Sequence, residues 1–331
     1  MDLSVLEGTR VLITGANGLI GKALVKKLIL HNGRKPIEVY ALVRNLEKAR
    51  KVFSVLPNNN LHIIVSDVCE LPAENLNIDY IVHGASKTAS KQFVNEPVEV
   101  IKSSVCGTER LLEFARMNPV KAFVYLSTME VYGAPDSEDE ITEESATNLI
   151  STSVRSSYPE SKRLCECLCA AYSSEYGVPA KVVRLTQTFG EGVEYNDGRV
   201  FAEFARCAIE GRDIVLKTKG ETKRNYVDIR DAVNAILTVL IKGNIGEAYN
   251  IANESTYCSI FEMALLVARE FGGGKVNVRI EDNGDAEIMG YAKTLKMNLS
   301  AEKLKSLGWE PEFSLKDSYR EMINWMQKIK L

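Results

Sequence analysis

The most reactive pair that the sequence offers is a tyrosine and a lysine four residues apart, in Tyr158-Pro-Glu-Ser-Lys162. In a helix, residues with this spacing lie on one face, so the ammonium can lower the pKa of the phenol. A phenolate placed in this way is a general base that can remove the proton of a substrate hydroxyl while hydride leaves the same carbon. Tyrosine and lysine are both common, so the spacing alone is a weak signal.

A second group of candidate residues follows an apolar run in VYLSTMEVYG, residues 124–133. Thr128 offers a hydroxyl and Glu130 a carboxylate, with the apolar Met129 between them. A strand that ends in this way presents polar side chains at its carboxyl end. Their chemistry depends on what the rest of the chain places opposite them.

The first apolar run of the chain leads directly into a glycine-rich turn, TGANGLIGKALVKKL. Gly15, Gly18 and Gly21 form GxxGxxG between a strand and a helix, where the chain turns sharply and a pyrophosphate can approach the backbone. The N–H groups and the positive dipole end of the helix then hold the phosphates. This context predicts a nicotinamide dinucleotide cofactor; the alternative is a plain tight turn.

Two residues at the ends of later strands bear on which dinucleotide binds. Arg44 follows the run EVYALV, where the common fingerprint has an acidic residue for the ribose hydroxyls. A guanidinium suits a 2′-phosphate and favours NADP, with a surface arginine or stacking on adenine as alternatives. Asp67, after the third strand, is expected to bind the adenine amino group. NAD and NADP therefore both stay open.

The predicted cofactor site extends over several strand ends and the start of the helix that carries Tyr158. Lys162 belongs to it because its ammonium can also reach the nicotinamide ribose. The full set is Gly15, Asn17, Gly18, Leu19, Ile20, Gly21, Arg44, Asp67, Val68, Ala85, Ser86 and Lys162.

The elements that carry these residues alternate between short β-rich runs and amphipathic stretches. The β-rich runs are 10–14, 38–43, 61–67, 80–85, 122–127 and 181–186. Strands that are apolar throughout and separated by helices indicate a parallel sheet covered on both faces. The predicted fold class is therefore α/β, a Rossmann-type doubly wound parallel sheet with a smaller mixed α/β C-terminal substrate lobe.

A chain of 331 residues exceeds the size at which one hydrophobic core stops growing, so we expect two lobes. The dinucleotide-binding domain is expected over 1–187, rejoined by about 222–252. The substrate-binding lobe is expected over 188–221 and 253–331. The acidic segment 135–146 is expected to be a mobile surface loop close to the site, or a solvated connection without function.

Composition excludes several classes of function. With 45% apolar residues, 26% charged residues and a net charge of −3, the chain has no electrostatic footprint for nucleic acid. It has no apolar stretch long enough for a membrane span, and its N-terminus lacks a signal-peptide pattern. The seven cysteines show no CxxC spacing and histidines number only three, so we expect a reduced, cytoplasmic protein with buried free thiols and no metal.

Taken together, these motifs resemble the extended short-chain dehydrogenase/reductase superfamily, which is the NAD-dependent epimerase/dehydratase family, over nearly the whole chain. The segments HGASKTAS (83–90), EPVEVIKSSVCGT (96–108) and YNDGRVFAEF (195–204) are similar to the UDP-glucuronate decarboxylase group. The Thr-x-Glu pattern is shared with the dTDP-glucose 4,6-dehydratases. The resemblance implies a nucleotide-diphosphate sugar as substrate, oxidised transiently at C4. It also implies that Tyr158 is the base and Lys162 its activator.

The resemblance assigns further residues. Thr128 would hydrogen-bond the reacting sugar oxygen, and Glu130 would act as a second base or hold a water. Arg224, in GETKRNYVDIRDA, would grip the nucleotide diphosphate. Arg199 would meet an acidic substrate or form a salt bridge at a helix start. The predicted substrate-binding set is Lys87, Thr128, Met129, Arg199 and Arg224.

Met129 and Ser104 are two of the positions that depart from the family pattern. Met129 stands where the decarboxylases usually have Ser and the hexose 4,6-dehydratases Asp, so dehydration by the usual acid is disfavoured. Ser104 stands where relatives have Asn in N-x-x-G-T, which puts the role of that Asn in doubt.

The favoured function is a redox-neutral nucleotide-sugar enzyme, a lyase or isomerase with internal redox and UDP-glucuronate decarboxylase-like chemistry. The alternatives within this class are a nucleotide-sugar 4-epimerase and a 4,6-dehydratase. A net NADPH-dependent carbonyl reductase is the alternative from another class, motivated by Arg44. A non-catalytic scaffold is disfavoured by the intact Thr128, Tyr158 and Lys162. The resemblance also implies a homodimer in which helices near 97–116 and 158–173 form a four-helix bundle.

Overall fold

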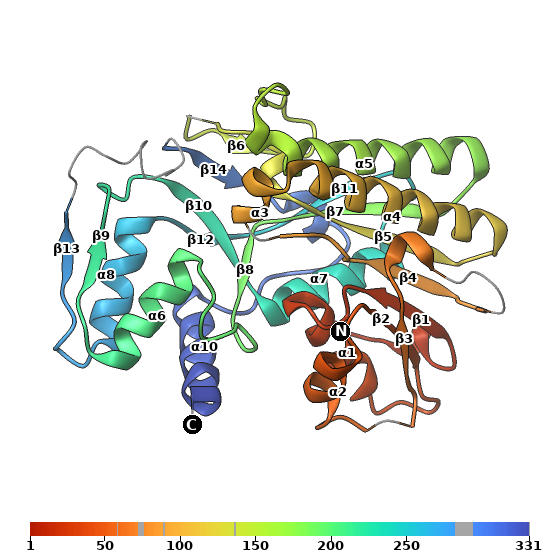
Figure 1. The fold of residues 1–331 in the computed structure, drawn as a ribbon, viewed down its shortest axis with the longest axis horizontal. Helices are drawn as coiled ribbons and strands as arrows, with labels where there is room; N and C mark the ends of the chain where they lie inside the picture. Colours follow the sequence, from red (N-terminus) through yellow and green to blue (C-terminus); the bar gives the residue numbers. More distant parts are fainter. Residues whose placement is uncertain (58, 72–75, 89, 136, 282–293, 331) are drawn as a thin grey trace.

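The main layer of the molecule is a seven-stranded parallel sheet in the order β11-β7-β5-β4-β1-β2-β3 (Figure 1). The computed structural model describes residues 1–57, 59–71, 76–88, 90–135, 137–281 and 294–330. The strands of this sheet are β1 (Arg10–Thr14), β2 (Glu38–Val43), β3 (Leu61–Val65), β4 (Tyr80–His83), β5 (Ala122–Thr128), β7 (Ala180–Leu185) and β11 (Ala248–Ile251). The chain winds outward from β1 and then, from β4, in the opposite direction, so the predicted doubly wound sheet is confirmed.

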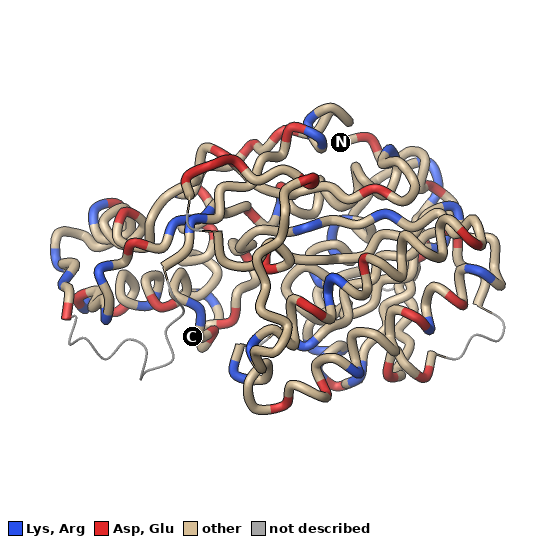
Figure 2. The backbone as a smooth tube through the Cα atoms, turned by 90° about the horizontal axis from the view of Figure 1, so that it is seen from above, with Lys and Arg blue, Asp and Glu red and all other residues tan. Residues whose placement is uncertain are grey.

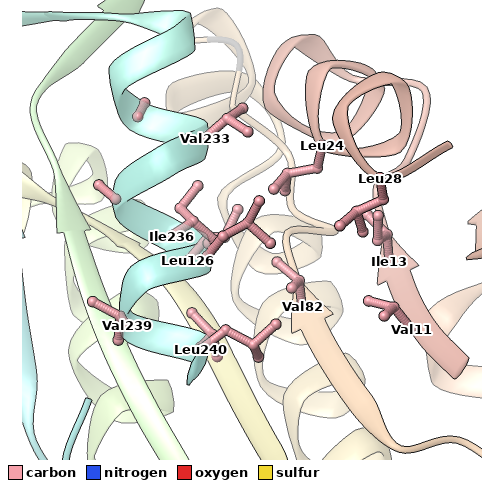
Figure 3. Close-up of a cluster of buried hydrophobic side chains, with 14 of the residues drawn as sticks. Val11, Ile13, Leu24, Leu28, Val82, Leu126, Val233, Ile236, Val239 and Leu240 are labelled. Atoms are coloured by element: carbon pink, nitrogen blue, oxygen red, sulfur yellow. The ribbon is translucent and has the colours of Figure 1, made fainter. Parts of the chain in front are cut away.

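Helices cover both faces of this sheet because its strands are apolar on both sides. One face carries α1 (Leu19–Ile29), α2 (Leu46–Phe53) and α7 (Ile229–Lys242), and the other carries α3 (Ser90–Asn95), α4 (Pro97–Met117) and α5 (Ser157–Tyr176). On β1, Val11 and Ile13 pack with α1 and α7 (Figure 3), whereas Leu12 belongs to the core beside α4 and α5. This alternation along β1 follows from the two-residue period of a strand.

Local signals fix the starts of several helices. Asp228 precedes α7, and its carboxylate accepts a hydrogen bond of 2.9 Å from the Arg230 amide. Ser259 and Glu262 form a reciprocal capping box at the start of α8 (Ile260–Phe271). Such caps satisfy N–H groups that have no partner within the helix.

A second group of elements packs beside the carboxyl ends of the main sheet. Five strands form a mixed sheet: β6 (Glu140–Ile141), β8 (Gln187–Phe189), β10 (Lys223–Asp228), β12 (Asn253–Ser259) and β14 (Lys296–Leu299). A two-stranded sheet contains β9 (Ile214–Leu216) and β13 (Val278–Ile280). The helices of this part are α6 (Val200–Glu210), α8, α9 (Glu302–Lys305) and α10 (Leu315–Lys330). Phe189, Tyr226 and Tyr319 lie at the centre of its hydrophobic core.

Short 3₁₀ helices complete the described structure: η1 (Ser4–Leu6), η2 (Val68–Glu70), η3 (Met129–Tyr132) and η4 (Val154–Ser156). Within the acidic segment, Glu140–Ile141 form β6 and pair with β14, and residue 136 lies outside the described residues, so the mobility of this segment stays a prediction. The chain passes between the two sheets more than once, because β7 and β11 belong to the main sheet whereas β8 and β12, which follow them, belong to the five-stranded sheet. The domain boundary at residue 187 therefore stays a prediction.

Acidic and basic residues are interspersed over the view in Figure 2. Within the described ranges, no helix is both long and apolar enough to cross a membrane.

Candidate active site

The glycine-rich turn between β1 and α1 leaves no room for side chains. Gly15 has a φ of +67°, and a Cβ there would lie 2.8 Å from the carbonyl oxygen of Gly84. A Cβ on Gly21 would overlap the carbonyl oxygen of Gly15. Gly18 has no side chain to cap α1, so the first N–H groups of this helix can bind a phosphate. The turn therefore fits the pyrophosphate of a dinucleotide.

A cavity of about 390 Å³ extends from this turn along the carboxyl ends of β2, β3, β4, β5 and β7. All the residues predicted to bind the cofactor line it: Gly15, Asn17, Gly18, Leu19, Ile20, Gly21, Arg44, Asp67, Val68, Ala85, Ser86 and Lys162. The other predicted site residues that line it are Lys87, Thr128, Met129, Glu130, Tyr158 and Arg199. Ligands of open α/β sheets bind at such strand ends, where the order of strands reverses. The binding and catalytic roles of these residues stay predictions.

Tyr158 and Lys162 lie in the first two turns of α5, both buried. The Lys162 ammonium donates a 2.7 Å hydrogen bond to the Leu126 carbonyl and lies 5.9 Å from the centre of the Tyr158 ring. Burial lowers the pKa of Lys162 to about 8. The pKa of Tyr158 is raised, first by burial and then by the charge of Glu130, whereas a hydrogen bond with Thr128 lowers it. Desolvation of the phenol outweighs the nearby cations Arg155 and Arg199, and the lowering of the phenol pKa by the Lys162 ammonium stays a prediction.

Two residues that the sequence did not single out enclose Tyr158. The ring of Phe93, on α3, stacks on the Tyr158 ring with 4.3 Å between centroids and 6° between planes. The Arg155 guanidinium lies 4.8 Å from the centre of the Phe93 ring and donates a 2.9 Å hydrogen bond to the Glu130 carboxylate. Glu130 is therefore held as one half of an ion pair. The only signal for Arg155 was its place three residues before Tyr158, and Phe93 had none.

Packing explains why the apolar Met129 stands between Thr128 and Glu130. Its side chain is buried in a small apolar cluster with Ile141, Met297 and Leu299, between the main sheet and the five-stranded sheet. Thr128 and Glu130 remain at the cavity on either side of it. The apolar residue thus anchors the turn that carries the two polar ones.

A buried histidine supports the floor of the cavity. His83, at the end of β4, lies 2.7 Å from the Thr14 hydroxyl through Nδ1 and 3.1 Å from the Thr108 hydroxyl through Nε2. The Thr14 oxygen already accepts from the amides of Gly84 and Ala85, so its own proton is directed to Nδ1. Burial lowers the pKa of His83 to about 3, which keeps the ring neutral.

Ser104, which replaces the family Asn, is buried in α4 behind Ser86. Its hydroxyl lies 3.5 Å from the Ser86 hydroxyl, and its carbonyl accepts from the Thr108 hydroxyl at 2.8 Å and the Cys165 thiol at 3.4 Å. A serine therefore keeps a polar group at this position but reaches less far than an asparagine would.

The predicted substrate-binding cations are placed differently from one another. Lys87 lines the cavity while donating a 2.6 Å hydrogen bond to Glu96, and Arg199 lines it while paired with Asp197. The salt bridge expected for Arg199 at the start of a helix is therefore present, before α6, and its contact with an acidic substrate stays a prediction. Arg224 is on β10, outside the residues that line this cavity, and its Nε is buried without a partner among the described residues.

The fold and the site define a dinucleotide-dependent enzyme of the short-chain dehydrogenase/reductase type. Residues 11–252 match the NAD dependent epimerase/dehydratase family. The chain therefore belongs to this family of nucleotide-sugar enzymes, as the motifs predicted.

Relatives of two activities align with almost the whole chain. UDP-glucuronic acid decarboxylase 1 of Xenopus tropicalis is 30% identical over 98% of this chain and 74% of the relative. The dTDP-D-glucose 4,6-dehydratase of Homo sapiens is 27% identical over 96% of this chain and 90% of the relative. The UDP-glucose 4-epimerase of Thermotoga maritima, solved with UDP-glucose, has a TM-score of 0.79 at 24% identity, covering 97% of this chain and 100% of its own. That structural similarity confirms the fold.

Proposed function

We propose that the enzyme decarboxylates a nucleotide-linked uronic acid such as UDP-glucuronate, through transient oxidation at C4. The observation that carries the proposal is the convergence of Thr128, Tyr158 and Lys162 on one cavity with the glycine-rich turn. The similarity to UDP-glucuronic acid decarboxylase 1 supports this choice within the family.

In the first step, Tyr158 removes the proton of the C4 hydroxyl, and Thr128 hydrogen-bonds the same oxygen. The dinucleotide that the turn of Gly15, Gly18 and Gly21 would hold would supply the hydride acceptor for C4. Lys162 holds a positive charge beside the ring of Tyr158 and favours the phenolate. Phe93 and the buried walls keep water away from the base.

In the second step, the C5–C6 bond of the 4-keto sugar breaks and carbon dioxide leaves. The electron pair delocalises onto the C4 oxygen as an enolate, and C5 takes up a proton from solvent. Tyr158 then returns the proton it removed to the C4 oxygen as the C4 ketone is reduced, with the hydride that the reduced dinucleotide would supply. A keto group β to a carboxylate makes this step easy, so the protein mainly positions the sugar. Met129 has no proton to give to a leaving hydroxyl, which disfavours dehydration.

The second candidate is a nucleotide-sugar 4-epimerase, with the 4,6-dehydratase behind it. The observation that favours it is the packing of Met129 into an apolar cluster, because Met129 then serves only as a lining residue. Glu130 is the acidic group that this turn presents at the cavity. The alternative of a net NADPH-dependent reductase is motivated by Arg44, because this arginine is exposed at the cavity and its guanidinium suits a 2′-phosphate. We propose NAD as the cofactor from the family description, with NADP as the alternative.

We also propose a homodimer formed through α4 and α5, which lie side by side in Figure 1. Val98 and Ile101 on α4 and Leu164 on α5 expose apolar side chains on the outside of this helix pair. The free cysteines are consistent with the proposed cytoplasmic location.

The test is to incubate the purified protein with UDP-glucuronate, with and without NAD or NADP, and to follow the mass of the sugar nucleotide. Loss of carbon dioxide supports the decarboxylase, and Tyr158→Phe should reduce its rate by about 10²–10⁴-fold. An unchanged mass with a new C4 epimer by NMR supports the epimerase instead. Steady consumption of NADPH would identify a reductase, and release of a tightly bound dinucleotide on denaturation identifies the cofactor.

A further inference from the structure

One face of α5 contacts the end of β5 at three consecutive residues. Lys162 donates to the Leu126 carbonyl at 2.7 Å, and the Ser127 hydroxyl donates to the Glu166 carboxylate at 2.5 Å. The hydroxyl of Thr128, the next residue of the strand, lowers the pKa of Tyr158. Residues 158, 162 and 166 are four apart, so one stripe of the helix holds the strand end.

Glu166 is itself fixed by Arg184 on β7. The Arg184 Nε lies 3.2 Å from each carboxylate oxygen, and its NH2 group lies 2.7 Å from Oε2. The two side chains are only 11% and 16% exposed. A planar guanidinium on a carboxylate in this forked geometry fixes direction as well as distance.

The same guanidinium reaches the turn that carries Glu130. Its NH1 group donates to the Tyr132 hydroxyl at 2.8 Å and to the Glu143 carbonyl at 3.1 Å. The Tyr132 hydroxyl donates onward to Asn250 on β11 at 2.7 Å. Arg184 therefore joins the helix of the base, the strand end and the turn of η3.

We propose that Glu166 and Arg184 are positioning residues, which set Thr128 and Glu130 relative to Tyr158 and Lys162; this inference rests on the proposed function. A buried ion pair adds little net stability compared with apolar residues of similar size, so stability alone does not explain it. Its contacts with Ser127, Tyr132 and Glu143 do join the helix of Tyr158 and Lys162 to the strand end of Thr128 and the turn of Glu130. Displacement of a reacting group by about 1 Å can cost about 10²-fold in rate.

The test compares Glu166→Gln and Ser127→Ala with Asp79→Asn, by kcat and KM for UDP-glucuronate. Asp79 is a matched control because it is also partly buried and ion-paired, with Lys121 at 2.9 Å, but lies at the opposite end of the sheet. Glu166→Gln is expected to lower kcat at least about tenfold with KM within about twofold, and Ser127→Ala to lower it less. Asp79→Asn should leave kcat unchanged.

Amide hydrogen exchange of the peptide 124–133 tests the positioning of the strand end without substrate or cofactor. Both site variants should exchange at least about tenfold faster there than the wild type, whereas Asp79→Asn should not. A folded Glu166→Gln with wild-type kcat, or with wild-type exchange in this peptide, overturns the inference. If the wild type leaves UDP-glucuronate unchanged, the proposed function fails and the exchange measurement alone decides on positioning. Should Glu166→Gln not fold, Ser127→Ala decides by the same criteria.

Discussion

The phenol of Tyr158 lies between two opposite charges. Glu130 raises its pKa and Arg155 lowers it, in addition to the larger effect of burial. Since Arg155 also pairs with Glu130 at 2.9 Å, one side chain both supplies a cation and partly neutralises the anion. The protonation of the base therefore depends on a residue that does not itself line the cavity but contacts two residues that do, Glu130 and Phe93.

Replacing Arg155 by glutamine should make the base harder to ionise. The phenolate is the active form, so a higher pKa moves the rising limb of the pH–kcat profile to higher pH. Each unit of pKa reduces the phenolate fraction about tenfold at a fixed lower pH, and the loss should diminish as the pH rises. The control is Arg163→Gln, which removes an exposed arginine of α5 that pairs with Glu160 at 3.7 Å. An equal loss of kcat at every pH would contradict this account.

His83 makes a separate prediction about stability. Its pKa is about 3 in the folded protein, against the ordinary value of 6.5 that we expect in the unfolded chain. Below pH 6.5 the unfolded chain therefore binds a proton that the folded protein does not, so this group destabilises the fold as the pH falls. From pH 7 to pH 5 its contribution to the free energy of unfolding should fall by about 2 kcal/mol.

Urea denaturation of the wild type and of His83→Gln at both pH values measures this effect. The glutamine variant should be less stable at pH 7 but lose about 2 kcal/mol less on acidification. His62→Gln is the control, because His62 is partly exposed and paired with Glu38 at 2.6 Å. Identical pH slopes for the wild type and His83→Gln would show that the ring is protonated in the folded state.

Among the elements, the β1–α1 turn imposes the strictest geometry. A Cβ on Gly21 would overlap the backbone of Gly15 and Ala16, so Gly21→Ala should push α1 away from the turn. We expect a loss of about 1–3 kcal/mol in stability and a loss of dinucleotide binding, measured by denaturation and calorimetry. Gly177→Ala, where no atom lies within 4 Å, should cost about 1 kcal/mol through its φ of +70° and leave binding intact. Equal dinucleotide affinity in both variants would contradict the proposed phosphate site.

The same element explains why so much of the cavity was predictable. A strand, three glycines and a helix form one local unit, and parallel strands deliver their carboxyl ends to one edge. Tyr158 and Lys162 were predicted from helical spacing together with the glycine-rich turn and the strand end at Thr128. That Arg224 lies outside the cavity lining could not be predicted, because the face to which a strand side chain points depends on pairing register, and a slip of one residue reverses it. Phe93 reaches Tyr158 through tertiary packing of the short α3, for which the sequence carries no periodic signal.

At the scale of the whole molecule, the α4–α5 surface leads to the last prediction. Val98, Ile101 and Leu164 are 58%, 41% and 48% exposed, although they lie on helices whose other faces are buried in the core. Residues 98 and 101 are three apart and so form one stripe. A two-fold axis beside this stripe would bury it against the same stripe of a second copy.

A lysine at Leu164 should weaken such a dimer, because a two-fold interface receives each substitution twice and would bury two charges. Sedimentation velocity should show the wild type at the mass of two chains and Leu164→Lys shifted toward one chain as the protein is diluted. Val55→Lys, at an 86% exposed position on the other side of the sheet beyond α2, should sediment as the wild type. A wild type that sediments as one chain at every concentration would rule out the dimer, and the exposed stripe would then need another partner. A dimer that persists unchanged in Leu164→Lys would place its interface elsewhere on the molecule.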